Sequence, residues 1–248
     1  MKTFSYVLFG NYIKKRYDKT IKKEWGSYMR RVTILGSGMM GKQIATFLIN
    51  NNMTVDLVKV TDTKDWQKDL AKLEAYVTKR LFKLEYINRL QVKHLEDVLT
   101  DGITSDLVIE AVVEDLVAKQ VLFGRVLAVI APETIIATNT STLSITRIAE
   151  GFKASEKNRF LGLHFFAPVR HMKLVEVIPH ELLSQVYVKK INHFISNQLG
   201  KEAIVVKDVL GFLANRIGFF ANHDVMRLSE HYGMAPELVD YLSCHALK

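Results

Sequence analysis

One histidine and one glutamate lie on residue runs that the sequence predicts to be neighbouring β-strands. His164 lies near the end of the apolar run 160–166, and Glu176 lies within the run 173–178. An imidazole titrates near neutral pH and can remove the proton of an alcohol, while a carboxylate partner fixes its tautomer and stabilises the imidazolium. The pair is therefore a candidate general base for oxidising a secondary alcohol. The alternative is a histidine satisfied inside the core, since two phenylalanines follow it.

Two further polar residues are expected at the ends of elements around the same crevice. Ser141 is expected at the end of a strand, and Asn215 at the start of a long helix over 212–232. With His164 and Glu176 they give four polar groups at one place. Such a set is what a hydride-transfer site needs, because the hydroxyl proton must leave as the carbon-bound hydrogen leaves.

A glycine-rich turn predicts a phosphate site. The sequence reads Gly36-Ser37-Gly38-Met39-Met40-Gly41. The turn follows a β-rich run, 32–35, and opens a helix over 39–50, which is the context in which this spacing indicates dinucleotide binding. The glycines permit a tight turn and a close approach of pyrophosphate to the backbone, and the free amides of the helix start bind the phosphates.

The position expected to read the adenosine ribose departs from this pattern. An acid usually ends the second strand of such a unit and accepts from the 2′-hydroxyl, but here that place is held by Lys59. A cation would attract a 2′-phosphate, so NADP is an alternative to NAD. Asp62 could instead bend back to the ribose, and a solvated lysine in a weakened site is the third reading.

Apolar strands and helices alternate along most of the chain. Strands are expected at 32–35, 54–60, 90–93, 106–112, 134–138, 160–166, 173–178 and 203–206, and helices at 39–50, 64–90, 95–99, 117–130 and 183–197. This alternation predicts an α/β protein with a Rossmann-type, doubly wound, mainly parallel sheet. We expect a dinucleotide-binding and catalytic domain over 29–207 and a short helical domain over 208–248, in which Gly233 ends one helix and Pro236 opens the next.

The charge is concentrated at the N-terminus. The chain of 248 residues carries a formal net charge of +8, and residues 1–31 hold nine basic and two acidic residues, a net +7, which leaves +1 for the other 217. A nearly neutral body argues against binding to nucleic acid. Residues 1–28 are expected to be a basic extension outside the fold. An alternative function is that of an interaction protein, in which the basic tail binds a partner and the fold serves only as a scaffold.

Cysteine content and hydropathy indicate the cellular compartment in which the protein is expected. The only cysteine, Cys244, cannot form an intramolecular disulfide, which favours a reducing compartment such as the cytoplasm. The apolar run 3–9 is too short to span a membrane, and its basic residues follow it rather than precede it, unlike a signal peptide. The scattered histidines have no zinc-ligand spacing, so no metal site is expected.

Five stretches resemble the successive motifs of L-3-hydroxyacyl-CoA dehydrogenases, in that family's order and with similar spacings. They are DLVIEAVVE (106–114), NTSTLSI (139–145), LHFFAP (163–168), MKLVEV (172–177) and GFLANR (211–216). The resemblance implies reversible oxidation of an L-3-hydroxyacyl-CoA to the 3-oxoacyl-CoA with NAD. It also implies that His164 is the base, Glu176 its partner, and Ser141 and Asn215 the groups that hold the substrate oxygen and the base. Glu114 and Lys119 match contacts to the nicotinamide ribose side of the cofactor.

Several positions depart from the family pattern. Lys59 replaces the ribose acid, Ala167 replaces an Asn, and Leu210 stands where a Pro is common. The segment that forms a helical arm over the CoA is short, although Lys79, Arg80 and Lys83 could still meet CoA phosphates. The helical domain that closes the cleft and forms the family's homodimer is represented only by its first two helices. A degenerate relative that binds nucleotide with little or no turnover is therefore a further alternative.

Overall fold

A computed structural model describes residues 28–61 and 65–246, and the basic extension 1–28 lies outside this part except for Tyr28. Its centre is an eight-stranded sheet in the order β3-β2-β1-β4-β5-β6-β7-β8. The strands are β1 (Arg31–Leu35), β2 (Thr54–Lys59), β3 (Leu90–His94), β4 (Leu107–Glu110), β5 (Ile135–Thr138), β6 (Phe160–Phe165), β7 (Leu174–Ile178) and β8 (Glu202–Val205). Only the β6–β7 pairing is antiparallel among these strands.

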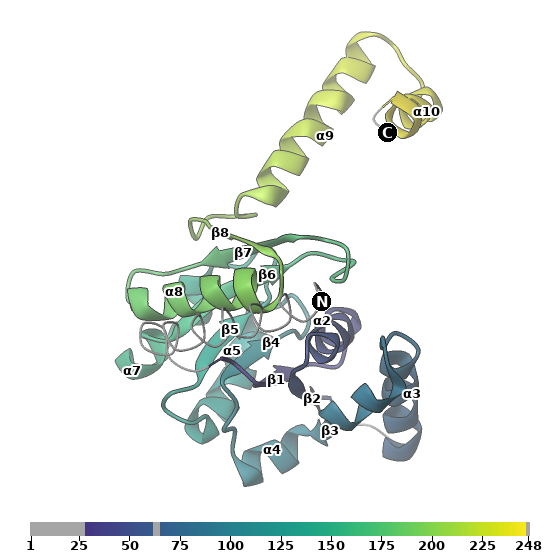
Figure 1. Ribbon diagram of the computed structural model, residues 1–248. Helices are drawn as coiled ribbons and strands as arrows, with labels where there is room; N and C mark the ends of the chain where they lie inside the picture. Colours follow the sequence, from purple (N-terminus) through teal and green to yellow (C-terminus); the bar gives the residue numbers. More distant parts are fainter. Residues whose placement is uncertain (1–27, 62–64, 247–248) are drawn as a thin grey trace, which may run out of the picture.

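Helices cover both faces of the sheet (Figure 1). In the body they are α2 (Met39–Asn50), α3 (Trp66–Thr78), η1 (Leu84–Arg89), α4 (Leu95–Asp101), α5 (Leu116–Val126), η2 (Leu127–Val129), α6 (Ile145–Ile148), α7 (Ala154–Lys157), α8 (Gln185–His193) and η3 (Phe194–Gln198). The predicted doubly wound, mainly parallel sheet is confirmed.

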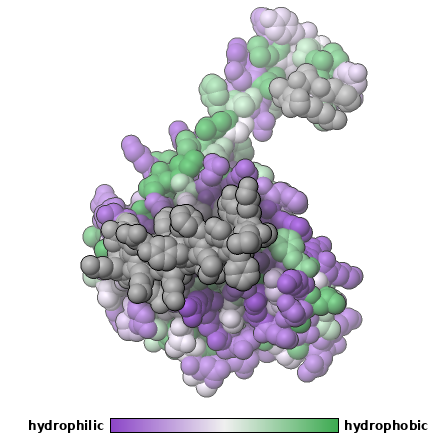
Figure 2. Space-filling model, viewed as in Figure 1, coloured by the Kyte–Doolittle hydropathy of each residue, from purple (hydrophilic) through white to green (hydrophobic). Residues whose placement is uncertain are grey.

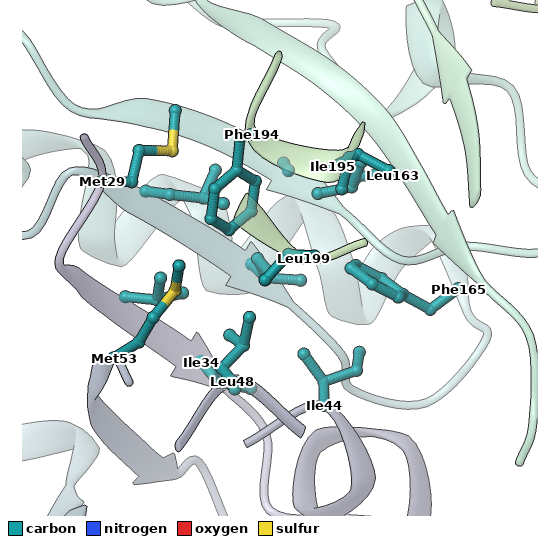
Figure 3. Close-up of a cluster of buried hydrophobic side chains, with 14 of the residues drawn as sticks. Met29, Ile34, Ile44, Leu48, Met53, Leu163, Phe165, Phe194, Ile195 and Leu199 are labelled. Carbon is teal, nitrogen blue, oxygen red and sulfur yellow. The ribbon is translucent and has the colours of Figure 1, made fainter. Parts of the chain in front are cut away.

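Each face of the sheet has its own apolar core. One core joins the sheet to α2, α3, α8 and η3, and the other joins it to α4, α5 and α6. Figure 3 shows part of the first core, where Ile34 of β1 and Leu48 of α2 gather with Leu163 and Phe165 of β6. Strands buried on both faces are near-continuously apolar, and β4 is fully buried along its length.

The predicted single helix over 64–90 is wrong. Helix α3 ends at Thr78, and residues 84–89 form the 3-10 helix η1. The side chain of Asn50, at the end of α2, donates to the Arg80 carbonyl oxygen at 3.1 Å and accepts from the Phe82 amide at 2.9 Å. In a continuous helix these backbone groups would bond to other backbone groups of the same helix. The tertiary contact with Asn50 takes their place and interrupts the helix.

Two helices project from the body at the C-terminal end (Figure 1). They are α9 (Ala214–His231) and α10 (Pro236–Ala246), separated near Gly233 as the sequence predicts. None of the residues of α9 is buried, and Phe219 and Phe220 are 64% and 72% exposed. In Figure 2 hydrophobic residues gather along this projection. Within the described part of the chain, no helix is both long and apolar enough to cross a membrane.

Candidate functional site

His164 and Glu176 form a buried pair on adjacent strands. They face each other in the antiparallel β6–β7 register, and His164 Nδ1 lies 2.8 Å from Glu176 Oε2. His164 is 4% exposed and Glu176 is fully buried. An ionised Glu176 carboxylate can only accept a hydrogen bond, so it pairs with the tautomer that carries its hydrogen on Nδ1 and keeps a lone pair on Nε2. The geometry fits a neutral imidazole prepared to take a proton.

The second oxygen of Glu176 anchors the start of α9. Glu176 Oε1 accepts from the amides of Leu213 at 2.9 Å and Ala214 at 2.8 Å. A carboxylate is stabilised at a helix N-terminus by the free amides there. Just before this point Phe212 has a φ of +50°, an unusual value for a residue other than glycine, and its ring lies 5.8 Å from that of His164. The first turn of α9 therefore belongs to the site.

Ser141 and Asn215 meet at this place, but through the backbone of Ser141. The Asn215 side-chain nitrogen donates to the Ser141 carbonyl oxygen at 3.2 Å. The expectation that Ser141 ends a strand is wrong, because β5 ends at Thr138 and Ser141 lies in the following loop. Asn215 is in the first turn of α9, as expected.

Glu114 organises the loop that carries Ser141. Its Oε1 accepts from the amides of Ser141 at 2.7 Å and Thr142 at 2.9 Å and from the Thr140 hydroxyl at 2.6 Å. Burial raises the pKa of Glu114, but these hydrogen bonds and the charge of Lys119 outweigh burial and hold the pKa below its ordinary value of 4.5. Glu114 is thus a charged carboxylate that fixes the loop.

Lys119 lies beneath this loop and is only 1% exposed. Its Nζ pairs with Glu110 Oε1 at 2.7 Å and with Glu114 Oε2 at 3.5 Å. Glu110, at the end of β4, also accepts from the Val112 amide at 2.6 Å and from the Thr138 hydroxyl at 2.6 Å. The sequence did not single out Glu110, although a carboxylate that ends an apolar strand was a usable signal.

Asp208 is a second residue that the sequence analysis missed. Its carboxylate accepts from the Ser144 hydroxyl at 2.9 Å and from the amides of Ile145 at 3.0 Å and Thr146 at 2.9 Å. Burial raises the pKa of Asp208, but these bonds outweigh it and leave the pKa below its ordinary value of 3.8. Asp208 fastens the segment leading to α9 to the N-terminus of α6, which keeps Asn215 near the Ser141 loop.

The glycine turn lies at the same edge of the sheet. Gly36 has a φ of +117°, and a Cβ there would lie 2.5 Å from the Ala111 oxygen, while a Cβ on Gly41 would overlap the Gly36 oxygen. A Cβ on Gly38 would meet nothing within 4 Å. Gly36 and Gly41 are thus required by packing, and Gly38 keeps the backbone open to a pyrophosphate.

A cavity of about 590 Å³ follows this turn, and a dinucleotide fits the residues that line it. It includes all of Gly36, Ser37, Gly38, Met39 and Met40, together with Lys59, Val112 and Val113. The start of α2 has no side-chain cap at Gly38, so its first amides are available to phosphate oxygens. Strands β1, β4, β5 and β6 run parallel, so the Gly36 turn and His164 share the carboxyl edge where such sheets bind ligands.

A second cavity, of about 600 Å³, was not predicted as a unit. Its lining combines α2, the end of α3 and the loop after β6, and includes Tyr76, Arg80, Phe82, Arg170 and His171. The guanidinium of Arg80 lies 3.8 Å from the Tyr76 ring centroid, and that of Arg170 lies 4.6 Å from the Phe82 ring centroid. Cations stacked on aromatic rings suit a ligand with phosphates and a flat base.

No cluster of three or more metal-ligating side chains occurs in residues 28–61 and 65–246.

Comparisons with known proteins point to one enzyme family. Residues 31–209 match the family model described as 3-hydroxyacyl-CoA dehydrogenase, NAD binding domain. The human mitochondrial hydroxyacyl-coenzyme A dehydrogenase is 35% identical over an alignment 248 residues long that covers 89% of this chain and 78% of the human one. The fatty acid oxidation complex subunit alpha of Vibrio campbellii is 40% identical over an alignment 215 residues long that covers 79% of this chain and 29% of that protein.

A solved structure with a similar fold also belongs to a hydroxyacyl-CoA dehydrogenase. The (S)-3-hydroxybutyryl-CoA dehydrogenase of Ralstonia eutropha superposes with a TM-score of 0.73 at 28% identity, covering 88% of this chain and 78% of that one. The chain spans 65% of a Deinococcus radiodurans relative and 27% of a Bacillus subtilis relative, both of which are named as 3-hydroxyacyl-CoA dehydrogenases. The family match over residues 31–209, together with the His164–Glu176 pair beside a glycine turn, identifies this chain as a member of the 3-hydroxyacyl-CoA dehydrogenase family that carries its NAD binding domain.

Proposed function

We propose that this protein catalyses the reversible oxidation of an L-3-hydroxyacyl-CoA to the 3-oxoacyl-CoA, a reaction of fatty acid oxidation. The observation that carries the proposal is the buried His164–Glu176 pair, with 2.8 Å between Nδ1 and Oε2. The pair lies at the sheet edge that also holds the Gly36 turn. The named activities of relatives that share up to 40% identity add support.

His164 is the general base in the oxidative direction. Its Nε2 takes the proton of the 3-hydroxyl group, and Glu176 stabilises the resulting imidazolium through the Nδ1 hydrogen bond. In the reductive direction the imidazolium returns the proton to the carbonyl oxygen. Bound NAD supplies the two-electron acceptor for the hydrogen on carbon 3. The first turn of α9, held on Glu176, fixes the carboxylate in place.

Ser141 and Asn215 position the reacting oxygen. Asn215 holds the Ser141 carbonyl, and Glu114 holds the Ser141 amide, so the serine hydroxyl is presented by a loop fixed from two sides. Glu114 faces the nicotinamide ribose side in this proposal. Lys119 acts beneath it through its ion pairs with Glu110 and Glu114. The glycine turn and the start of α2, which together span Gly36 to Gly41, bind the pyrophosphate.

The aromatic and cationic cavity takes the CoA part of the substrate. Arg80, Arg170 and His171 offer positive charge and hydrogen-bond donors to phosphates, and Tyr76 and Phe82 offer flat apolar surface. Of the basic residues suggested by the sequence, Arg80 lines this cavity. Lys83 instead lies 3.9 Å from Glu85, exposed to solvent.

The test is oxidation of NADH with acetoacetyl-CoA, followed by absorbance, for the wild type, His164→Gln and His231→Gln. General acid–base catalysis contributes about 10²–10⁴-fold, so His164→Gln should lose that factor in kcat. NADH affinity should be unchanged. His231→Gln, an exposed site at the end of α9, is the matched control. Wild-type protein that binds NADH but does not oxidise it would instead support the degenerate relative.

We also infer that the dinucleotide-binding and catalytic domain spans 29–207 and that 208–248 forms a helical substrate and dimerisation domain. Exposed apolar side chains on α9 and α10, such as Phe219, Phe220 and Leu242, support a homodimer through these helices. Sedimentation of the wild type and Phe220→Asp tests it. A monomer at all concentrations for the wild type contradicts the homodimer.

For the compartment we propose the cytoplasm. The support is the single cysteine, Cys244, which is exposed and free. Exposed thiols persist where the surroundings are reducing. Fractionation of the native cells tests this, and recovery of the protein with a membrane or an organelle contradicts it.

A further inference from the structure

Strand β2 ends at a lysine, Lys59. Lys59 lines the dinucleotide cavity together with the glycine turn. The Gly36 amide donates to the carbonyl oxygen of Val58, the neighbour of Lys59, at 2.9 Å, so the turn and the lysine are held close together. A cation at this position would by itself favour the 2′-phosphate of NADP. The family to which the chain belongs nevertheless binds NAD.

An acid from another element lies beside this lysine. Lys59 Nζ is 3.2 Å from Asp69 Oδ2, and the two side chains are 17% and 29% exposed. Both charges are therefore largely withdrawn from solvent, where charge interactions are screened less than at an open surface. Asp69 lies ten residues beyond Lys59, in the first turn of α3.

The placement of Asp69 is fixed by local contacts. Asp65 caps α3 by accepting from the Lys68 amide at 3.0 Å. The ring of Trp66, the first residue of α3, stacks on His94 with 3.5 Å between ring centroids. His94 is the register partner of Lys59 across the β2–β3 pairing. The start of α3 is thus attached to the strand next to Lys59, which keeps the carboxylate within reach of the ammonium.

We propose that the Lys59–Asp69 pair reads the adenosine 2′-position and makes the site selective for NAD over NADP. Asp69 supplies, from α3, the carboxylate that the end of β2 lacks. A 2′-hydroxyl can donate to the carboxylate and accept from the ammonium. A 2′-phosphate would bring about two negative charges next to Asp69, and Lys59 is already neutralised by that residue.

This inference rests on the nucleotide-binding part of the proposed function and not on the reaction with acyl-CoA. Its test is equilibrium binding of NADH and of NADPH without acyl-CoA, followed by fluorescence, for the wild type and three variants. They are Asp69→Asn, Lys59→Met and Glu74→Gln. Glu74 is an exposed acid on the same helix and is the matched control. Thermal unfolding of each variant checks that the fold is retained.

Substitutions of the two members of the pair are expected to change NADPH affinity in opposite directions. Asp69→Asn should tighten NADPH binding by on the order of tenfold, because the ammonium is released to meet the 2′-phosphate. Lys59→Met should weaken NADPH binding and increase the preference for NADH, because the carboxylate then faces the phosphate alone. Glu74→Gln should leave both affinities unchanged.

Two results would overturn the inference. One is a wild type that binds NADPH more tightly than NADH. The other is an NADH-to-NADPH affinity ratio that Asp69→Asn and Glu74→Gln leave equally unchanged. Selective NADH binding without oxidation of NADH by acetoacetyl-CoA would contradict the proposed reaction and leave this inference standing.

Discussion

Helix α5 in the body and helix α9 at the C-terminal end both carry several apolar side chains, but the surroundings of these side chains are very different. In α5, Leu122, Phe123 and Val126 are buried against the sheet. In α9, Ile217, Phe219 and Phe220 are each more than 60% exposed. An apolar stripe at helical spacing thus predicts a helix in both cases. The stripe does not say what will cover it, since that partner lies elsewhere in space.

The largest expected difference between the two regions comes from removing an aromatic ring. Phe160 is fully buried and packs edge-on against Phe123 and Phe152, with ring centroids 5.3 and 5.0 Å away. Phe160→Ala should lower the free energy of unfolding by about 3–5 kcal/mol. Phe219→Ala should change it by no more than about 0.5 kcal/mol. Urea unfolding at a concentration where the protein is monomeric measures both, and equal losses would mean that α9 is packed in solution.

Breaking an ion pair should give the next largest contrast. Lys119→Met leaves Glu110 buried without its cation, and we expect a loss of about 3–5 kcal/mol. Arg227 pairs with Asp224 on α9 at 3.2 Å, with side chains 61% and 45% exposed, so Arg227→Met should change stability by at most about 1 kcal/mol. Chemical denaturation measures both. A small loss for Lys119→Met would show that Glu110 gains another partner or a proton.

Substitutions of two glycines with open space around them, one in the body and one in α9, should have smaller effects. A Cβ on Gly38 or on Gly218 would meet nothing within 4 Å. Gly218→Ala lies inside α9 and should stabilise that helix by about 1 kcal/mol, which slows its amide hydrogen exchange about fivefold. Gly38→Ala should leave the melting temperature unchanged and weaken NADH binding, because the methyl group meets the pyrophosphate. Unchanged NADH affinity would place the phosphates elsewhere.

The smallest expected effect is on the acid side of the pH–stability profile. The pKa values of Glu114 and Asp208 lie below their ordinary values of 4.5 and 3.8 in the folded protein. The two carboxylates therefore stabilise the folded protein fully when the pH is above those ordinary values. This stabilisation is lost as the pH falls through their pKa values in the folded state. Glu114→Gln should flatten this decline, whereas Glu230→Gln, at an exposed site on α9, should not. Urea unfolding between about pH 6 and about pH 3 measures it, and equal slopes would argue against a charged Glu114.

Much of the catalytic edge could be read from the sequence. The glycine spacing after a β-rich run predicts the phosphate turn, and the positions of His164 and Glu176 on consecutive strands predict their pairing across β6 and β7. The end of α9 at His231, shortly before Gly233, follows from the same kind of local pattern. These features depend on backbone preferences and on the spacing of apolar residues. Both are determined by residues that are close together in the sequence.

Other features depended on contacts between distant residues. Asn50 ends α3 early because it bonds backbone groups thirty and thirty-two residues further along the chain. Lys119, which matches a cofactor contact of the family, also pairs in the folded chain with Glu110 and Glu114.

The residue types alone thus determined a doubly wound sheet with a phosphate turn and an imidazole–carboxylate pair at one edge. Only the tertiary structure decided which acid neutralises Lys59, because Asp69 comes from a helix whose approach is set by Trp66 and His94. A charged side chain reaches several ångströms in any direction, so its partner follows from packing and not from its place in the chain.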